Sequence, residues 1–138
     1  MTDADKNTMT AIFGEVIHSY TRQQAIEDGY LVDISEMARE AGFVFPVAIT
    51  RAAWEDCVKW DESDSKRQTY QDISGRLWDV LWMAKQGARR GGEVIHFQLL
   101  RVPHGGRVTK PRLTTLKAIC GPSDDFSPCI TIMLPGED

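Results

Sequence analysis

Apolar residues repeat at helical spacing most strongly between residues 74 and 88. They form two adjacent stripes, one of Leu77, Leu81, Ala84 and Ala88 and one of Trp78 and Trp82, widened by Val80 and Met83. Because apolar side chains cover most of the circumference, the pattern predicts a helix that is contacted on several sides. Only a thin polar edge remains, formed by Arg76, Asp79, Lys85 and Gln86.

Shorter helices are predicted in the first half of the chain. Thr21 and Gln24 fit a capping box, in which the threonine hydroxyl accepts a backbone N–H and the glutamine reaches back. Gly29 is suited to end this helix in a left-handed conformation. Upstream, residues 1–10 are predicted to be disordered, and a short strand is predicted at residues 15–18.

Further helices are expected from Asp33 or Ser35 through Ala41, and from Thr50 to about Trp60. Between them, residues 43–49 are predicted to be extended, and Pro46 favours a position at a sheet edge. Residues 61–69 are the most polar stretch of the chain and are predicted to form a solvated, mobile loop.

The last third of the chain has the pattern of β-structure. Residues 93–102, 112–120 and 129–134 alternate or concentrate apolar side chains, and turn sequences separate them. These segments predict a three-strand antiparallel meander whose covered face packs against the helix at residues 74–88. The predicted fold is therefore a single α+β domain at residues 11–138.

Composition narrows the class of protein. Apolar residues make up 42% of the 138 residues, as in ordinary globular domains, and no apolar run is long enough for a transmembrane helix. The polar N-terminus lacks the basic region followed by an apolar region that is typical of a secretion signal, so a cytoplasmic location is expected. Three cysteines without a CxxC pair are expected to be reduced thiols.

Charge is segregated along the chain. Residues 1–84 carry a net charge of −7, residues 85–117 carry +7 and residues 118–138 carry −4. The basic middle could bind an anionic partner such as nucleic acid, or it could pair with acidic helices of the same molecule. We favour internal pairing, since a pI near 5.4 argues against a dedicated nucleic-acid binder. The basic candidates are Lys85, Arg89, Arg90, Arg101, Arg107, Lys110 and Arg112.

Motifs for catalysis or metal binding are sparse. The histidines at positions 18, 96 and 104 have no zinc-ligand spacing, and there is no P-loop, GxGxxG or GxSxG sequence. We therefore expect no metal and no cofactor. Nothing in the sequence places Cys57 or Cys120 beside His96, so a catalytic pair is not predicted. An acidic run at Glu55, Asp56, Asp61, Glu62 and Asp64 predicts a solvated face or, alternatively, a patch that mimics nucleic-acid phosphates or docks to a basic partner.

The segment around His18, Tyr20 and Thr21 resembles the first motif of ADP-ribosyltransferase folds, a strand ending in histidine followed by a hydroxyl residue and a short helix. In that family the histidine and hydroxyl hold the nicotinamide ribose, which would assign these roles to His18 and Thr21. The later Tyr/Ser and Glu motifs have no clear counterpart in this chain.

A broader resemblance covers nearly the whole chain after residue 11. It rests on stretches such as Tyr20-Thr21-Arg22, Ala38-Arg39-Glu40-Ala41-Gly42-Phe43, Gly75-Arg76-Leu77-Trp78-Asp79 and Cys120-Gly121-Pro122. These resemble a family of small uncharacterised bacterial proteins often encoded on plasmids and other mobile elements. The resemblance implies an accessory or anti-defence role, such as interference with CRISPR or restriction systems, and it assigns no catalytic residue.

The sequence therefore predicts a protein-binding module or inhibitor, with an unidentified protein partner and no membrane association. Arg76 and Asp79 on the polar edge, together with the basic candidates above, are the predicted binding residues. The alternatives are an ADP-ribosyltransferase-like enzyme using His18, Tyr20 and Thr21, and a nucleic-acid binder using residues 85–117. The oligomeric state stays open.

Overall fold

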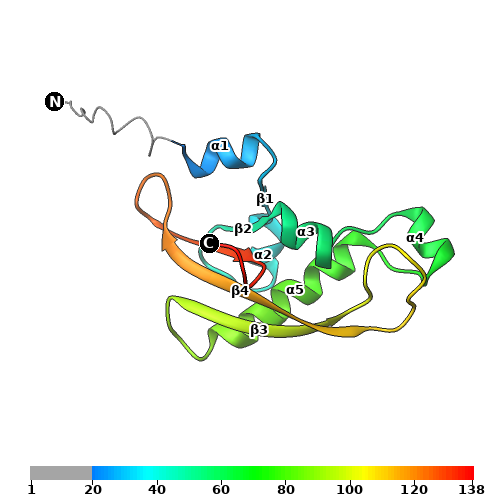
Figure 1. Cartoon of the computed structure of the whole chain (residues 1–138). Helices are drawn as coiled ribbons and strands as arrows, with labels where there is room; N and C mark the ends of the chain where they lie inside the picture. The colour runs from blue at the N-terminus through cyan, green and yellow to red at the C-terminus, as the bar shows by residue number, and fades with distance from the viewer. Residues whose placement is uncertain (1–19) are drawn as a thin grey trace. The chain divides into compact units, whose positions relative to one another are not determined.

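The computed structural model describes residues 20–138 (Figure 1). The chain forms two compact units, Met1–Leu31 and Val32–Asp138, which we describe separately. The predictions of a disordered start at residues 1–10, of a strand at residues 15–18 and of a role for His18 lie outside the described residues.

The first unit contains helix α1, Arg22–Glu27. Its predicted capping box is confirmed: the Gln24 backbone N–H donates to Thr21 Oγ1 at 3.0 Å, and the Thr21 N–H donates to Gln24 Oε1 at 2.9 Å. Gly29 follows with a positive φ of 83°, a conformation that glycine adopts without steric cost. Local sequence chemistry therefore sets both ends of this helix.

The remaining elements build a five-stranded mixed sheet and its helical cover. They are β1 (Leu31–Asp33), α2 (Ser35–Glu40), β2 (Val47–Thr50), α3 (Arg51–Cys57), α4 (Glu62–Arg67), α5 (Ile73–Ala88), β3 (Val94–Arg101), β4 (Arg112–Pro122) and β5 (Pro128–Met133). The strand order is β1-β2-β5-β4-β3. β4 pairs antiparallel with β3 and β5, whereas β2 and β5 are parallel.

The predicted three-strand antiparallel meander is wrong, because the sheet continues from β5 into β2 and β1. The prediction that Pro46 marks a sheet edge is wrong for the same reason. Pro46 precedes the strand, so its missing N–H is not needed for pairing, and its carbonyl accepts from the Ile130 N–H at 2.9 Å. The run at residues 47–49 is buried, as expected of an interior strand with short continuous apolar sequence.

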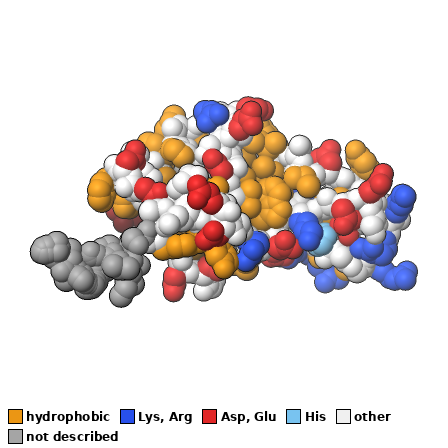
Figure 2. Space-filling view, turned by 90° about the horizontal axis from the view of Figure 1, so that it is seen from above, with side chains coloured by type: hydrophobic (Ala, Val, Ile, Leu, Met, Phe, Trp, Pro, Cys, Tyr) orange, Lys and Arg blue, Asp and Glu red, His pale blue; other side chains and the backbone are white. Residues whose placement is uncertain are grey.

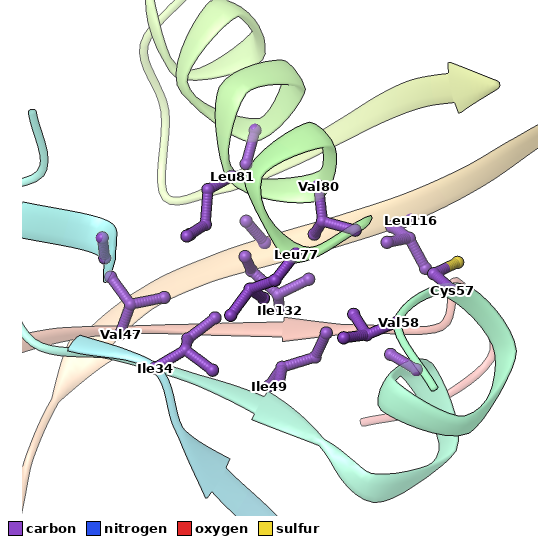
Figure 3. Packing of buried hydrophobic residues seen from close by; sticks show 14 of the residues in the cluster. Ile34, Val47, Ile49, Cys57, Val58, Leu77, Val80, Leu81, Leu116 and Ile132 are labelled. Atoms are coloured by element: carbon purple, nitrogen blue, oxygen red, sulfur yellow. The ribbon is translucent and has the colours of Figure 1, made fainter. Parts of the chain in front are cut away.

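The core lies between α5 and the sheet (Figure 3). Leu77, Val80 and Leu81 point from α5 toward Leu116 and Ile132 on the strands, and all five are buried. Burying an aliphatic side chain of this size stabilises the fold by roughly 1.5–3 kcal/mol. This face of α5 therefore contributes directly to the core of the second unit.

The prediction that α5 is contacted on several sides is wrong. Trp78, Trp82 and Met83 are exposed on its outer face, where the two indole rings stack with centroids 6.2 Å apart. Arg76, predicted to lie on a polar edge, is buried instead. No helix within residues 20–138 is long and apolar enough to span a membrane.

The prediction of a mobile loop at residues 61–69 is also wrong, because α4 forms there. Asp61 caps the helix by accepting the Asp64 N–H at 2.8 Å, and Asp64 Oδ2 accepts the Asp61 N–H at 2.9 Å. This is a capping box built from two aspartates instead of the usual hydroxyl and glutamate. The polar side chains in the stretch 61–64 therefore help to cap the N-terminus of α4.

Candidate functional site

A buried polar cluster joins α4 to the loop at residues 102–111. Asp64 is only 2% exposed, and its Oδ1 accepts from Arg67 Nη2 at 2.7 Å. Its Oδ2 lies 2.9 Å from His104 Nε2 in the loop. Figure 1 shows α4 beside this loop, which connects β3 and β4. We call Asp64, Arg67, Gln68, Arg76 and His104 the polar clamp.

Two side chains of the polar clamp hold the loop by its backbone. Gln68 Nε2 donates to the carbonyls of Pro103 at 2.8 Å and Val108 at 2.6 Å. Arg67 Nε donates to the Gly106 carbonyl at 2.8 Å. Because these carbonyls lack strand partners, the side chains of α4 supply the hydrogen bonds that order the loop.

Arg76 extends the polar clamp into the interior. It is 4% exposed and donates to Gln71 Oε1 at 2.7 Å and to the carbonyls of Val102 at 2.8 Å and Val58 at 3.1 Å. Its guanidinium lies 4.6 Å from the centroid of the Trp60 ring, a favourable cation–π distance. Burial lowers the pKa of Arg76. Arg76 therefore contributes to packing and is not displayed for binding as the sequence predicted.

The carboxylate of Asp64 is paired with cationic or hydrogen-bonding groups of the polar clamp. Burial alone would raise the pKa of Asp64, but the Asp61 backbone N–H and the charges of His104 and Arg67 lower it on balance. Asp61, Asp64 and His104 also place ligand-type atoms within 4.8 Å of one another. Since both Asp64 oxygens already accept hydrogen bonds, one of them from the Arg67 cation, an ion-pair network explains this cluster without a metal.

A second group of polar and aromatic residues, beside the polar clamp, is open to solvent. Two adjoining pockets of about 360 and 620 Å³ share Tyr70, Gln71 and Asp72. The smaller pocket reaches Trp78 and Asp79 on α5, and the larger reaches the start of α4. Tyr70 is 79% exposed. We call this surface the acidic groove, defined by Asp61, Glu62, Tyr70, Asp72, Trp78 and Asp79.

The electrostatics of the acidic groove favour a positive ligand. Carboxylates occur along both pockets, and Lys66 is the exposed cation in their lining, since Arg76 is buried. Burial raises the pKa of Asp79, while the charge of Arg76 acts in the opposite direction. Asp72 also caps α5 through the Gly75 N–H at 2.7 Å. Figure 2 shows hydrophobic side chains that reach the surface between acidic and basic side chains.

The basic residues predicted to bind an anion divide into two kinds. Arg101 forms a partly buried ion pair with Asp56 at 2.8 Å, and Lys85 donates to the Gly42 carbonyl at 2.6 Å. The contact of Arg101 on β3 with Asp56 on α3 is one instance of the internal pairing that we favoured from the sequence. The others are exposed after α5, in the loop after β3 and at the start of β4: Arg89, Arg90, Arg107, Lys110 and Arg112.

Tyr20 and Thr21, from the segment that resembles the first motif of ADP-ribosyltransferase folds, lie in the first unit. The Thr21 hydroxyl oxygen is engaged in the capping box, and the Tyr20 hydroxyl donates to Asp28 Oδ2 at 2.8 Å. Desolvation and this hydrogen bond raise the pKa of Tyr20 to about 12. Both hydroxyls thus have local structural roles.

Cys57 is not an activated thiol. Burial raises the pKa of Cys57 to about 11, so this thiol is protonated at neutral pH and is a poor nucleophile. His96 is exposed on β3 and carries no interaction that links it to Cys57 or Cys120 within residues 20–138.

Sequence patterns pointed to Asp79 but missed Tyr70 and Asp72. Trp78 was assigned to the core because its spacing fits an apolar stripe. A usable signal was available in Tyr70-Gln71-Asp72, where an aromatic residue stands among polar residues directly before a capped helix. Such an aromatic side chain has no helix or strand pattern to bury it.

Residues 8–138 match the model of DUF6573, a family of unknown function, and the chain belongs to this family. No curated protein and no solved structure matches the chain.

Proposed function

We propose that this protein is a protein-binding module that docks a basic segment of its partner in the acidic groove. The observation that carries the proposal is the exposed Tyr70, which stands with Trp78 among the carboxylates of Asp72 and Asp79. In the neighbouring polar clamp, Asp64 is paired with Arg67 and His104, whereas Tyr70 and the carboxylates around it face solvent.

The chemistry of the acidic groove matches lysine and arginine side chains. Such cations are attracted to the faces of tyrosine and tryptophan by roughly 0.5–2 kcal/mol each, with the larger value where water is excluded. The surrounding carboxylates accelerate association and select against acidic partners. A tyrosine or tryptophan that becomes buried on binding is also the typical energetic centre of a protein interface.

The finer part of the proposal is an inhibitory role in the cytoplasm against a host defence complex. It is supported by the resemblance to proteins of mobile elements, together with the negative charge of the acidic groove. Proteins that bind nucleic acid present basic surfaces to its phosphates. An acidic, aromatic groove could occupy such a surface in place of the phosphates, as the acidic run in the sequence suggested.

The test is capture of purified CRISPR and restriction complexes by the full chain, with native mass spectrometry of the products. We expect a complex with the unmodified protein and its loss in Tyr70→Ala combined with Asp79→Asn. Phe126→Ala is the matched control, because Phe126 is an exposed aromatic residue in the turn after β4. Capture that is unchanged by the groove variant would overturn the proposed docking site.

A nucleic-acid binder is the second candidate, and the exposed arginines and lysine after α5 and in the β3–β4 region favour it. Phosphate contacts are strongest at low salt. A gel shift that is present at low salt and weakened by Arg107→Ala with Arg112→Ala would support this function, and an absent shift would remove it.

A further inference from the structure

The two edges of the sheet differ in length and protection. β1 forms one edge and has three residues, whereas β3 forms the other and has eight. Long edge strands usually carry lysine, proline or a bulge that prevents pairing with another chain. β3 contains none of these residues and has a single charged residue, Arg101, at its end.

The backbone of β3 offers alternate hydrogen-bonding groups to this open side. The Cys120 N–H donates to the Glu93 carbonyl at 2.8 Å, and the register continues through Val94 opposite Ile119. In an antiparallel ladder, residues that exchange hydrogen bonds with the neighbour alternate with residues that point their N–H and C=O away. Even-numbered residues of β3 therefore point these groups outward: Val94, His96, Gln98 and Leu100.

The side chains along this edge are partly apolar and exposed. Val94 is 50% exposed and Leu100 is 61% exposed. A groove of about 540 Å³ between the edge and α5 is lined by Leu99, Leu100, Trp82 and Met83, and Trp82 is 47% exposed. Asp79 lines both this groove and the acidic groove, whereas Tyr70 does not line this one, so Tyr70 distinguishes the two surfaces.

We propose that β3 pairs antiparallel with β3 of a second copy of this chain, about a two-fold axis that passes beside Phe97. This register places Val94 opposite Leu100 of the second copy and His96 opposite Gln98 of the second copy. On the face toward α5, Ile95 meets Leu99, again from opposite copies. Apolar and polar residues thus each find a complement.

Neighbouring registers lack this complementarity. Because even-numbered residues must exchange the hydrogen bonds, the register can shift only in steps of two residues. A shift in one direction sets Val94 against Gln98, and a shift in the other sets His96 against Leu100. The interface is isologous, as is usual in dimers, and joins two sheets into one while covering the exposed apolar edge.

The test is the oligomeric state of the full chain, measured by light scattering after gel filtration and by native mass spectrometry. We expect a dimer. V94K with L100K places like charges opposite each other at both ends of the interface, so we expect the dissociation constant to rise about tenfold or more. V94K with L100E places opposite charges there and is expected to restore the dimer.

Both positions are exposed, so the double variants are expected to keep the far-UV circular dichroism of the unmodified protein. A monomer at all concentrations, or a dimer that V94K with L100K leaves intact, would overturn the interface. A dimer that is lost in the first variant and not restored in the second would overturn the register. Tyr70→Ala is expected to dimerise normally, so failure here is distinct from failure of the acidic groove.

Discussion

The polar clamp and the acidic groove adjoin one another around α4 and the start of α5, yet their side chains are arranged in opposite ways. In the polar clamp, Asp64 faces Arg67 and His104, and Arg76 lies against Trp60. In the acidic groove, aromatic and acidic side chains occur together with Lys66 as the exposed cation, and Tyr70 faces solvent.

The difference teaches how to interpret the acidic and basic segments of the sequence. Some of the charge is used inside the molecule, as in the pairs of Asp64 with Arg67 and of Asp56 with Arg101. The polar clamp should therefore control stability, and the acidic groove should control binding.

The largest expected effect is on stability, from Arg76→Met. The substitution removes donors to the buried carbonyls of Val58 and Val102 and leaves them unsatisfied. Since each buried hydrogen bond to a charged group contributes roughly 1.5–3 kcal/mol, we expect a loss of about 3 kcal/mol or more in the free energy of unfolding. Urea denaturation measures it, and a loss below about 1 kcal/mol would show that the buried guanidinium is dispensable.

Asp64→Asn should have the next largest effect. The neutral side chain keeps the shape but weakens the contacts with Arg67 and His104, at a cost of about 2–3 kcal/mol in unfolding free energy. Hydrogen exchange in the loop at residues 102–111 should accelerate as well. Glu55→Gln is the matched control, because Glu55 forms an exposed pair with Lys59 that contributes below about 1 kcal/mol. Equal losses in the two variants would contradict the special role of the polar clamp.

The stability contributed by Asp64 should depend on pH in the acid range. Its pKa is lower in the folded state, so the contribution is complete above the unfolded value of about 4. Protonation removes that contribution as pH falls through the lower folded-state pKa. Thermal melts of the wild type should therefore show a steeper loss below about pH 4 than those of Asp64→Asn. Parallel curves for the two proteins would argue against this assignment.

The smallest effect on stability is expected in the acidic groove. Tyr70→Ala removes a side chain that is mostly in solvent, so the free energy of unfolding should change by less than about 0.5 kcal/mol. Binding of a basic partner should nevertheless weaken about tenfold or more, as for an aromatic residue at the centre of an interface. A parallel loss of stability, seen in the same thermal melts, would assign Tyr70 to the fold instead.

Local signals in the sequence predicted the features that depend on neighbouring residues. The Thr21 capping box is an example, because its donors and acceptors lie within three positions. The partnership of β2 with β5 could not be predicted in this way, since it joins residues far apart in the chain and leaves no periodic pattern.

The candidate site was predicted only in part, and α5 shows why. Helical spacing identifies which residues share a face, but it does not say which face meets the sheet. Trp78 was therefore placed inside and Arg76 outside, whereas the structure has the reverse. The carbonyls that make burial of Arg76 favourable come from distant loops, and the sequence carries no local sign of them.

The most direct test of the acidic groove is isothermal titration calorimetry of the full chain with short peptides. The peptides have equal length and each contains one leucine or tryptophan, but they differ in net charge. We predict that only the lysine- and arginine-rich peptides bind. Their affinity should fall with rising salt, and about tenfold or more in Tyr70→Ala with Asp79→Asn, but not in Phe126→Ala. Equal binding of acidic and basic peptides, or basic binding that survives the groove variant, would contradict the account.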